Sequence, residues 1–166
     1  RSGVGIDRFR GAAHAGALFF FEVLESGAFE TTLTLENFEL WQAGLLAHTL
    51  HPLLADSQPF GFGTRRGLGR LHGEVAEANL TYFGQQSHAA EGGCSLYGLA
   101  ALANEASRGL YSLRDEPAPS PTLPGARLAS SVGLRQTWAL NDAAMNALWA
   151  GGAAAWQALC AEEVAG

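Results

Sequence analysis

The chain has 166 residues, of which 48% are hydrophobic and 16% charged, and its net charge at pH 7 is −6. This composition supports a packed core of about one domain and excludes an intrinsically disordered chain. The negative charge excludes a protein that coats nucleic acid with its whole surface, but a focused basic groove on an acidic body remains possible. All ten basic residues are Arg, and six of them fall within the two short windows 1–10 and 65–70.

The N-terminal segment begins at Arg1 within a stretch that reads as a strand, which suggests that a further segment precedes it. The tetrapeptide Asp7-Arg8-Phe9-Arg10 follows. Two guanidiniums beside an aromatic ring suit phosphate contact together with base stacking. The alternative is a solvated turn with Phe9 in the core, and we favour it for this tetrapeptide alone. Asp7 is expected to pair with one of its Arg neighbours.

Two strands are predicted next. The apolar run from Ala17 to Leu24 has strand length, and the segment from Ala28 to Glu36 alternates between apolar and polar residues. Ser26-Gly27 supplies a turn between them. We therefore expect these two segments to form a hairpin with one buried face.

The clearest helix is predicted from Asn37, as a possible cap, to about Ala55, because apolar residues recur there at three- and four-residue steps. Beyond the loop that follows, Leu68 to Phe83 reads as a strand or strand pair with a bend near Ala76. Later segments predict a helix over Ser95–Arg108, a Pro-rich linker over Asp115–Gly125, and a second long helix over Asn141–Val164 interrupted at Gly151-Gly152. Trp149 and Trp156 share one face of that helix, which predicts either core packing or docking on a neighbouring subunit.

The most distinctive stretch is the Gly-Arg loop, which we define as residues 59–73. Five of its residues are Gly and three are Arg. Glycines allow a close backbone approach, and guanidiniums donate in planar forks that match phosphate. A Walker A loop is excluded because the chain has no Lys, and a dinucleotide-binding loop is excluded because the helix precedes the glycines. A glycine-rich connector with incidental arginines is the alternative.

Catalytic patterns are absent from the sequence. Neither a GxSxG elbow nor an HExxH motif occurs, and the five histidines are scattered. His88 and Cys94 can be drawn as a nucleophile pair, but no third member supports it. Cys94 and Cys160 lack metal-ligand spacing and are both expected to be buried small side chains. No apolar run approaches the ~20 residues of a membrane helix, so a cytoplasmic protein is expected.

Taken in order, the motifs over about residues 1–83 resemble the RAMP superfamily, and more narrowly the backbone subunits of type III CRISPR effector complexes. The resemblance is carried by Arg1-x4-Ile6-Asp7-Arg8, Gly11-Ala12, Gly16-Ala17-Leu18-Phe19, Glu22, Gly27-x-Phe29, Trp41-x-x-Gly44-Leu45-Leu46 and Gly61-x-Gly63-x-x-Arg66-Gly67-x-Gly69-Arg70.

The resemblance implies an α+β protein with a modified ferredoxin-like (RNA-recognition-motif-like) domain over 1–83. Residues 84–166 would form a loop, a Pro-rich linker and a helical extension. It further implies binding of CRISPR RNA and its complementary target RNA, beside other effector subunits. The RNA-binding residues that the resemblance implies are Arg8, Gly61, Gly63, Arg66, Gly67, Gly69 and Arg70. Arg10 and Arg65, which stand beside them in the two Arg-rich windows, complete the predicted RNA-binding set.

Whether the chain is an enzyme stays open at this point. Several relatives cut target RNA with an Asp and a divalent metal, but no position here can be assigned as that catalytic Asp. Binding would require no cofactor, whereas a nuclease would require a metal such as Mg²⁺. The alternative function is a protein–protein assembly module whose Gly-Arg loop is inert.

Overall fold

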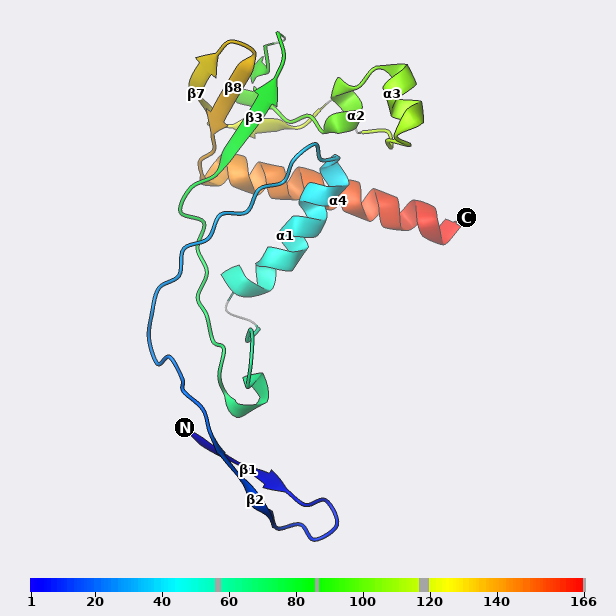
Figure 1. Cartoon of the computed structure of the whole chain (residues 1–166). Helices are drawn as coiled ribbons and strands as arrows, with labels where there is room; N and C mark the ends of the chain where they lie inside the picture. Colours follow the sequence, from blue (N-terminus) through cyan, green and yellow to red (C-terminus); the bar gives the residue numbers. More distant parts are fainter. Residues whose placement is uncertain (56–57, 86, 117–119, 166) are drawn as a thin grey trace. The chain divides into compact units, whose positions relative to one another are not determined.

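The computed structural model describes residues 1–55, 58–85, 87–116 and 120–165, and these form two compact units, Arg1–Thr34 and Leu35–Gly166 (Figure 1). Helices are combined with antiparallel sheets throughout the described residues. The predicted α+β class is therefore confirmed. Together with the long C-terminal helix, the arrangement is consistent with the ferredoxin-like expectation.

The first unit is a hairpin of β1 (Ser2–Ile6) and β2 (Ala13–Phe20), which pair antiparallel. The predicted hairpin between 17–24 and 28–36 is wrong, because residues 21–36 form no strand. β2 instead pairs with the segment just before it, since a short turn closes at low entropic cost. No residue of 1–34, all of which are described, is buried. An isolated two-stranded sheet cannot shield its own side chains from water.

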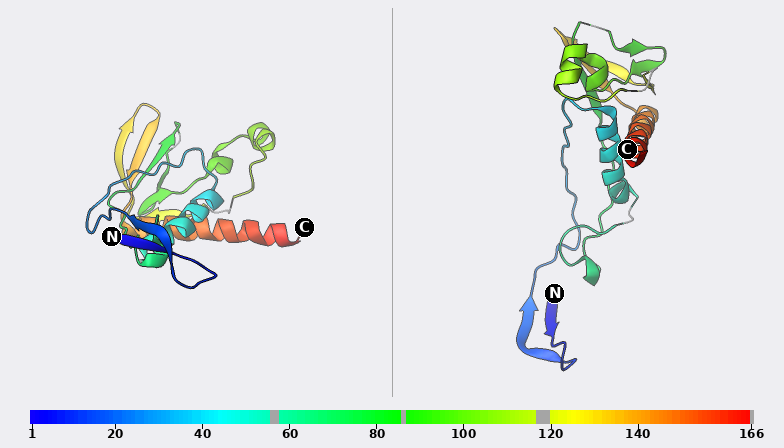
Figure 2. Two further views of the ribbon diagram at one scale, coloured as in Figure 1. Left: turned by 60° about the horizontal axis from the view of Figure 1, so that its bottom comes forward. Right: turned by 90° about the vertical axis from the view of Figure 1, so that its right-hand side faces the viewer.

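The second unit is built on two helices, α1 (Leu40–Leu54) and α4 (Asp142–Ala165), which cross in the views of Figures 1 and 2. At the crossing, Gly44 lies against Gly152, and a Cβ on Gly44 would overlap the Gly152 carbonyl. The predicted interruption at Gly151-Gly152 is wrong, because α4 continues through it. The absence of side chains at this point lets the two helix backbones approach closely.

The N-terminus of α1 differs from the prediction by two residues. Asn37 adopts a left-handed conformation (φ 49°), and Glu39 is the N-cap. Gln42 Oε1 accepts a hydrogen bond from the Glu39 N–H at 2.9 Å, as in a capping box. The Glu39 carboxylate also accepts from Trp41 Nε1 at 3.1 Å and from the Arg114 N–H at 2.7 Å. Glu39 therefore ties the start of α1 to the backbone at Arg114.

Two three-stranded antiparallel sheets complete the second unit. The first sheet has the order β3-β8-β7 and consists of β3 (Asn79–Phe83), β7 (Arg127–Val132) and β8 (Arg135–Ala139). The second sheet has the order β4-β5-β6 and consists of β4 (Ala89–Ala90), β5 (Gly93–Ser95) and β6 (Thr122–Pro124).

Several predicted segments are shorter or more broken than expected. Of the strand predicted over 68–83, only β3 forms. The helix predicted over 95–108 is two short helices, α2 (Leu99–Leu102) and α3 (Glu105–Leu110). The predicted linker contains β6, and residues 117–119 of it lie outside the described residues.

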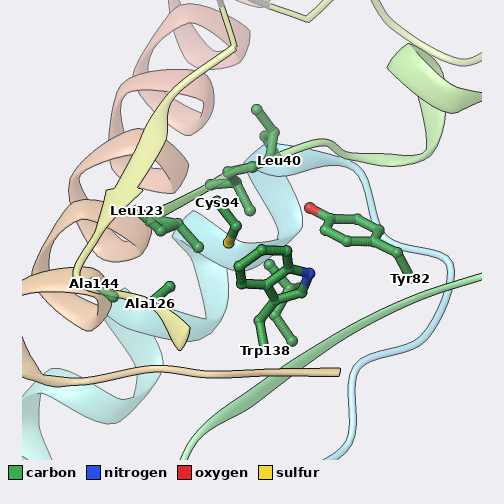
Figure 3. Packing of buried hydrophobic residues seen from close by; sticks show 9 residues of the cluster. Leu40, Tyr82, Cys94, Leu123, Ala126, Trp138 and Ala144 are labelled. Carbon is green, nitrogen blue, oxygen red and sulfur yellow. The ribbon is translucent and has the colours of Figure 1, made fainter. Parts of the chain in front are cut away.

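The core lies between the sheets and α4, and Figure 3 shows its packing around Trp138. Its buried members are Leu40, Leu80, Tyr82, Cys94, Leu96, Leu123, Ala126, Trp138 and Ala144. Cys94 is buried as predicted, but Cys160 is exposed, which corrects that expectation. Trp156 stacks on Trp41 of α1 with ring centroids 5.9 Å apart. The tryptophan face of α4 thus packs, at Trp156, inside the unit.

The compact units meet at residues 34 and 35, whereas the predicted domains meet at 83 and 84. β3 pairs with β8, and α1 packs on α4, so the segments before and after residue 83 share one core. The predicted division into domains 1–83 and 84–166, which follows the family resemblance, stays a prediction.

Candidate nucleic-acid interface

The Gly-Arg loop folds into a closed turn within the second unit. Its tip is a short 3₁₀ helix, η1 (Thr64–Arg66), flanked by Gly63 (φ 75°) and Gly67 (φ 77°) in the left-handed region. The Phe60 N–H donates to the Gly69 carbonyl at 2.8 Å, which closes the neck of the loop. The predicted loop residues from 61 to 70 are therefore brought together in one local structure.

Glycine is required at this neck for two reasons. Gly69 has a φ of 79°, and a Cβ there would overlap the Phe60 carbonyl. Gly61 and Gly67 also have positive φ, but space is open around them. At those two positions the requirement is conformational alone, since L-residues rarely adopt this region.

The three arginines of the loop are exposed to solvent on this turn. Arg65 and Arg66 belong to η1, and Arg70 follows the neck. Arg70 lines a hollow of about 590 Å³, whose other lining residues are Gln58, Pro59, Thr64, Gly67, Leu68, Leu71 and His72. The Arg70 guanidinium at this hollow can donate two parallel hydrogen bonds to phosphate oxygens. No sequence pattern marks Gln58 or Thr64, which had not been predicted.

A second basic tip lies in the first unit, in the turn between β1 and β2. The Asp7 carboxylate accepts from the Phe9 N–H at 2.8 Å and from the Arg10 N–H at 3.2 Å. The expectation that Asp7 pairs with a guanidinium is corrected, because its bonds are to backbone amides. Arg8 and Arg10 are exposed, and Phe9 is 102% exposed rather than in the core. The turn thus presents two guanidiniums and an aromatic ring to solvent.

Arg8 and Arg10 belong to the first unit, and the loop residues belong to the second. Each group is a basic element of its own unit.

The buried titratable groups lie elsewhere in the second unit. The His88 ring stacks beside Tyr82, with centroids 4.2 Å apart, and its Nδ1 has no hydrogen-bond partner among the described residues. Burial lowers the pKa of His88 and raises the pKa of Cys94 to about 11. A thiol with a raised pKa is the reverse of an activated nucleophile. The hypothetical His88–Cys94 pair therefore does not have the chemistry of a catalytic pair.

Among the described residues, no three His, Cys, Asp or Glu side chains converge as a metal site would require. Within the same residues, no helix is long and apolar enough to cross a bilayer.

Comparison with protein-family models gives a match over the N-terminal part of the chain. The sequence model of the RAMP superfamily matches residues 1–72, which include the hairpin, α1 and the loop through Arg70. No curated protein and no solved structure matches the chain. The resemblance to the RAMP superfamily is thereby confirmed over these residues.

Proposed function

We propose that this chain, a RAMP-superfamily sequence over residues 1–72, is a guide-RNA-binding backbone subunit of a type III-like CRISPR effector complex. It would act in antiviral defence in the cytoplasm, beside other effector subunits. Phosphate contacts would position the CRISPR RNA, while base pairing would read the target RNA.

One observation carries this proposal: the family match includes a closed, glycine-framed turn that presents three arginines. The chain has a net charge of −6, so a concentration of positive charge on one turn needs an explanation beyond composition. An anionic polymer bound at that turn provides one. The exposed Arg8-Phe9-Arg10 tip adds guanidiniums and a ring that suit a single strand.

The test is a filter-binding titration of single-stranded RNA at several salt concentrations. Arg66→Ala with Arg70→Ala should weaken binding and flatten the slope of log K against log salt by about 0.7 for each lost phosphate contact. Arg108→Ala, which removes one guanidinium from α3, is the control and should leave both quantities unchanged. An unchanged slope in the loop variant would show that the loop does not bind phosphates.

Cleavage of target RNA is a finer part of the proposal. It would require a divalent metal held by carboxylates together with RNA phosphates, and among the described residues no three His, Cys, Asp or Glu side chains converge to hold one. Incubating the assembled complex with target RNA and Mg²⁺ tests this directly, and intact target RNA would count against it.

A second candidate is an assembly module whose Gly-Arg loop is inert. The exposed apolar side chains of the hairpin favour it, since Ile6, Leu18 and Phe20 all face solvent. The protein purified from its source cells discriminates between the two functions. Co-purifying RNA of defined length supports the guide-binding subunit, whereas protein partners without RNA support the assembly module.

A further inference from the structure

The sheet β3-β8-β7 lies outside the family match and has one face that the core does not use. Residues directly opposite each other in an antiparallel pair share a face, and neighbours along a strand alternate. Leu80, Tyr82 and Trp138 therefore mark the core face. The register places the following residues on the opposite face, which we call the open face: Asn79, Thr81, Phe83, Arg127, Ser130, Val132, Arg135, Thr137 and Ala139.

The open face combines an aromatic ring with arginines and hydroxyl groups. Phe83 is 75% exposed and lies opposite Arg135, which in turn lies opposite Val132. Arg127 lies at the other end of the open face. It is opposite Ala139, which is four residues beyond Arg135 along β8. Thr81 and Thr137 share a hydrogen bond of 3.1 Å between these rows. None of the nine residues is buried.

The charge on the open face is opposite to that of the chain. It has two arginines and no carboxylate, although acids outnumber bases by 16 to 10 in the sequence. In the described part of the chain, neither Arg127 nor Arg135 takes part in an ion pair or a side-chain hydrogen bond. The nearest carboxylate along β3 is Glu77, which accepts from the Asn79 amide just before the strand. Both guanidiniums are therefore available to an anionic ligand.

We propose that the open face is a second binding site for single-stranded RNA, separate from the Gly-Arg loop. One base stacks on Phe83, and the flanking phosphates contact Arg135 and, about 14 Å away along the strand direction, Arg127. Thr81, Thr137 and Ser130 offer hydroxyl groups to sugars and phosphates between them. With a single aromatic ring, the face accepts one base without reading its identity.

RNA is a better occupant than a protein for reasons of charge and chemistry. An apolar protein partner would cover Phe83 and Val132, but it would leave two unpaired guanidiniums in the interface, which is costly. An acidic protein could neutralise them, but its carboxylates would gain nothing from the negative face of the exposed ring. A single strand satisfies the ring, the guanidiniums and the hydroxyl groups together. The ligand class is the same as in the proposed function, but the site shares no residue with the Gly-Arg loop.

The experiment measures binding of a fluorescent oligouridine of about ten nucleotides, a length within the range of single-strand sites. Phe83→Leu keeps an apolar side chain but removes the ring, and we expect roughly tenfold weaker binding. Arg127→Gln with Arg135→Gln should flatten the salt slope by about 1.4. The controls are Tyr111→Leu, which removes another exposed ring, and Arg108→Gln, which removes one half-buried guanidinium that pairs with Asp115.

The outcomes separate the open face from the Gly-Arg loop. If Phe83→Leu and the double Arg variant bind as tightly as the parent, the open-face site is wrong, whatever the loop variant does. If they weaken binding while Arg66→Ala with Arg70→Ala does not, the open face stands and the proposed loop function fails. A crosslink from 4-thiouridine RNA to the peptide containing Phe83 supports the site directly. Loss of self-association or of a protein partner in Phe83→Leu, with RNA binding intact, would make the open face a protein interface instead.

Discussion

The two compact units differ in how far they bury apolar side chains, although both contain apolar segments. In Leu35–Gly166, two helices and two sheets enclose side chains such as Leu123, which is 0% exposed. In Arg1–Thr34, the strands carry comparable residues, yet Leu18 is 61% exposed. The difference shows that an apolar pattern buries nothing until a second layer lies against it. The first unit therefore has no second layer of its own to cover its apolar side chains.

The largest expected effect tests the difference in burial between the two units directly. Leu123→Ala should lower the free energy of unfolding by about 2–5 kcal/mol, because it leaves a cavity in a closed core. Leu18→Ala, the same chemical change in the first unit, should change it by less than about 0.5 kcal/mol. Urea denaturation followed by circular dichroism measures both. Equal effects of the two substitutions would mean that the hairpin has a core of its own.

The crossing of α1 and α4 gives the next largest effect. Gly44→Ala forces a methyl group into the Gly152 backbone, which should cost about 1–3 kcal/mol of stability or more. Gly109→Ala is the control, since space is open around Gly109 in α3 and alanine favours helix by up to about 1 kcal/mol. Thermal unfolding should shift in opposite directions for the two variants. A neutral Gly44→Ala would contradict the backbone contact.

A third substitution compares two glycines within the Gly-Arg loop. Gly69→Ala should open the neck, because its methyl group overlaps the Phe60 carbonyl and its backbone stores about 1–3 kcal/mol of strain. Gly67→Ala carries only the strain of positive φ. The measurement is the rate of tryptic cleavage after Arg65 and Arg66, which should rise more in Gly69→Ala. Equal rates would show that closure at the neck does not order the tip.

The smallest effect is a pH dependence that only the second unit should show. Burial lowers the pKa of His88, so the folded state holds the ring neutral while the unfolded state binds a proton below its ordinary pKa of about 6.5. The free energy of unfolding should therefore fall as the pH drops through that value. Comparison with His88→Gln isolates the contribution of His88, because the half-buried Glu116, whose pKa is raised, is present in both proteins. The control His14→Gln should keep the pH dependence. Parallel curves of unfolding free energy against pH for the parent and His88→Gln would refute the contribution of His88.

Local sequence patterns predicted the helices well and the strand pairing poorly. The periodicity of α1 and α4 was sufficient because a helix bonds within itself, although the cap of α1 and the Gly151-Gly152 break were wrong. The helix predicted over 95–108 is two short helices instead. The partner of β2 depends on which segment closes first, and alternation over 28–36 does not encode it. The loop glycines could be identified because positive φ demands them. The open face could not, because it arises from a register between Phe83 and Arg135, which lie far apart in the sequence.

The stacked pair of Trp41 and Trp156 has a practical consequence. Two indoles with centroids 5.9 Å apart couple their electronic transitions, so the near-ultraviolet circular dichroism should contain a signal that belongs to this pair. One ring is on α1, directly upstream of the Gly-Arg loop, and the other is near the end of α4. The circular dichroism signal of this pair is thus an intrinsic probe of the separation between α1 and α4. Any ligand that moves α1 against α4 would be seen without attaching a label.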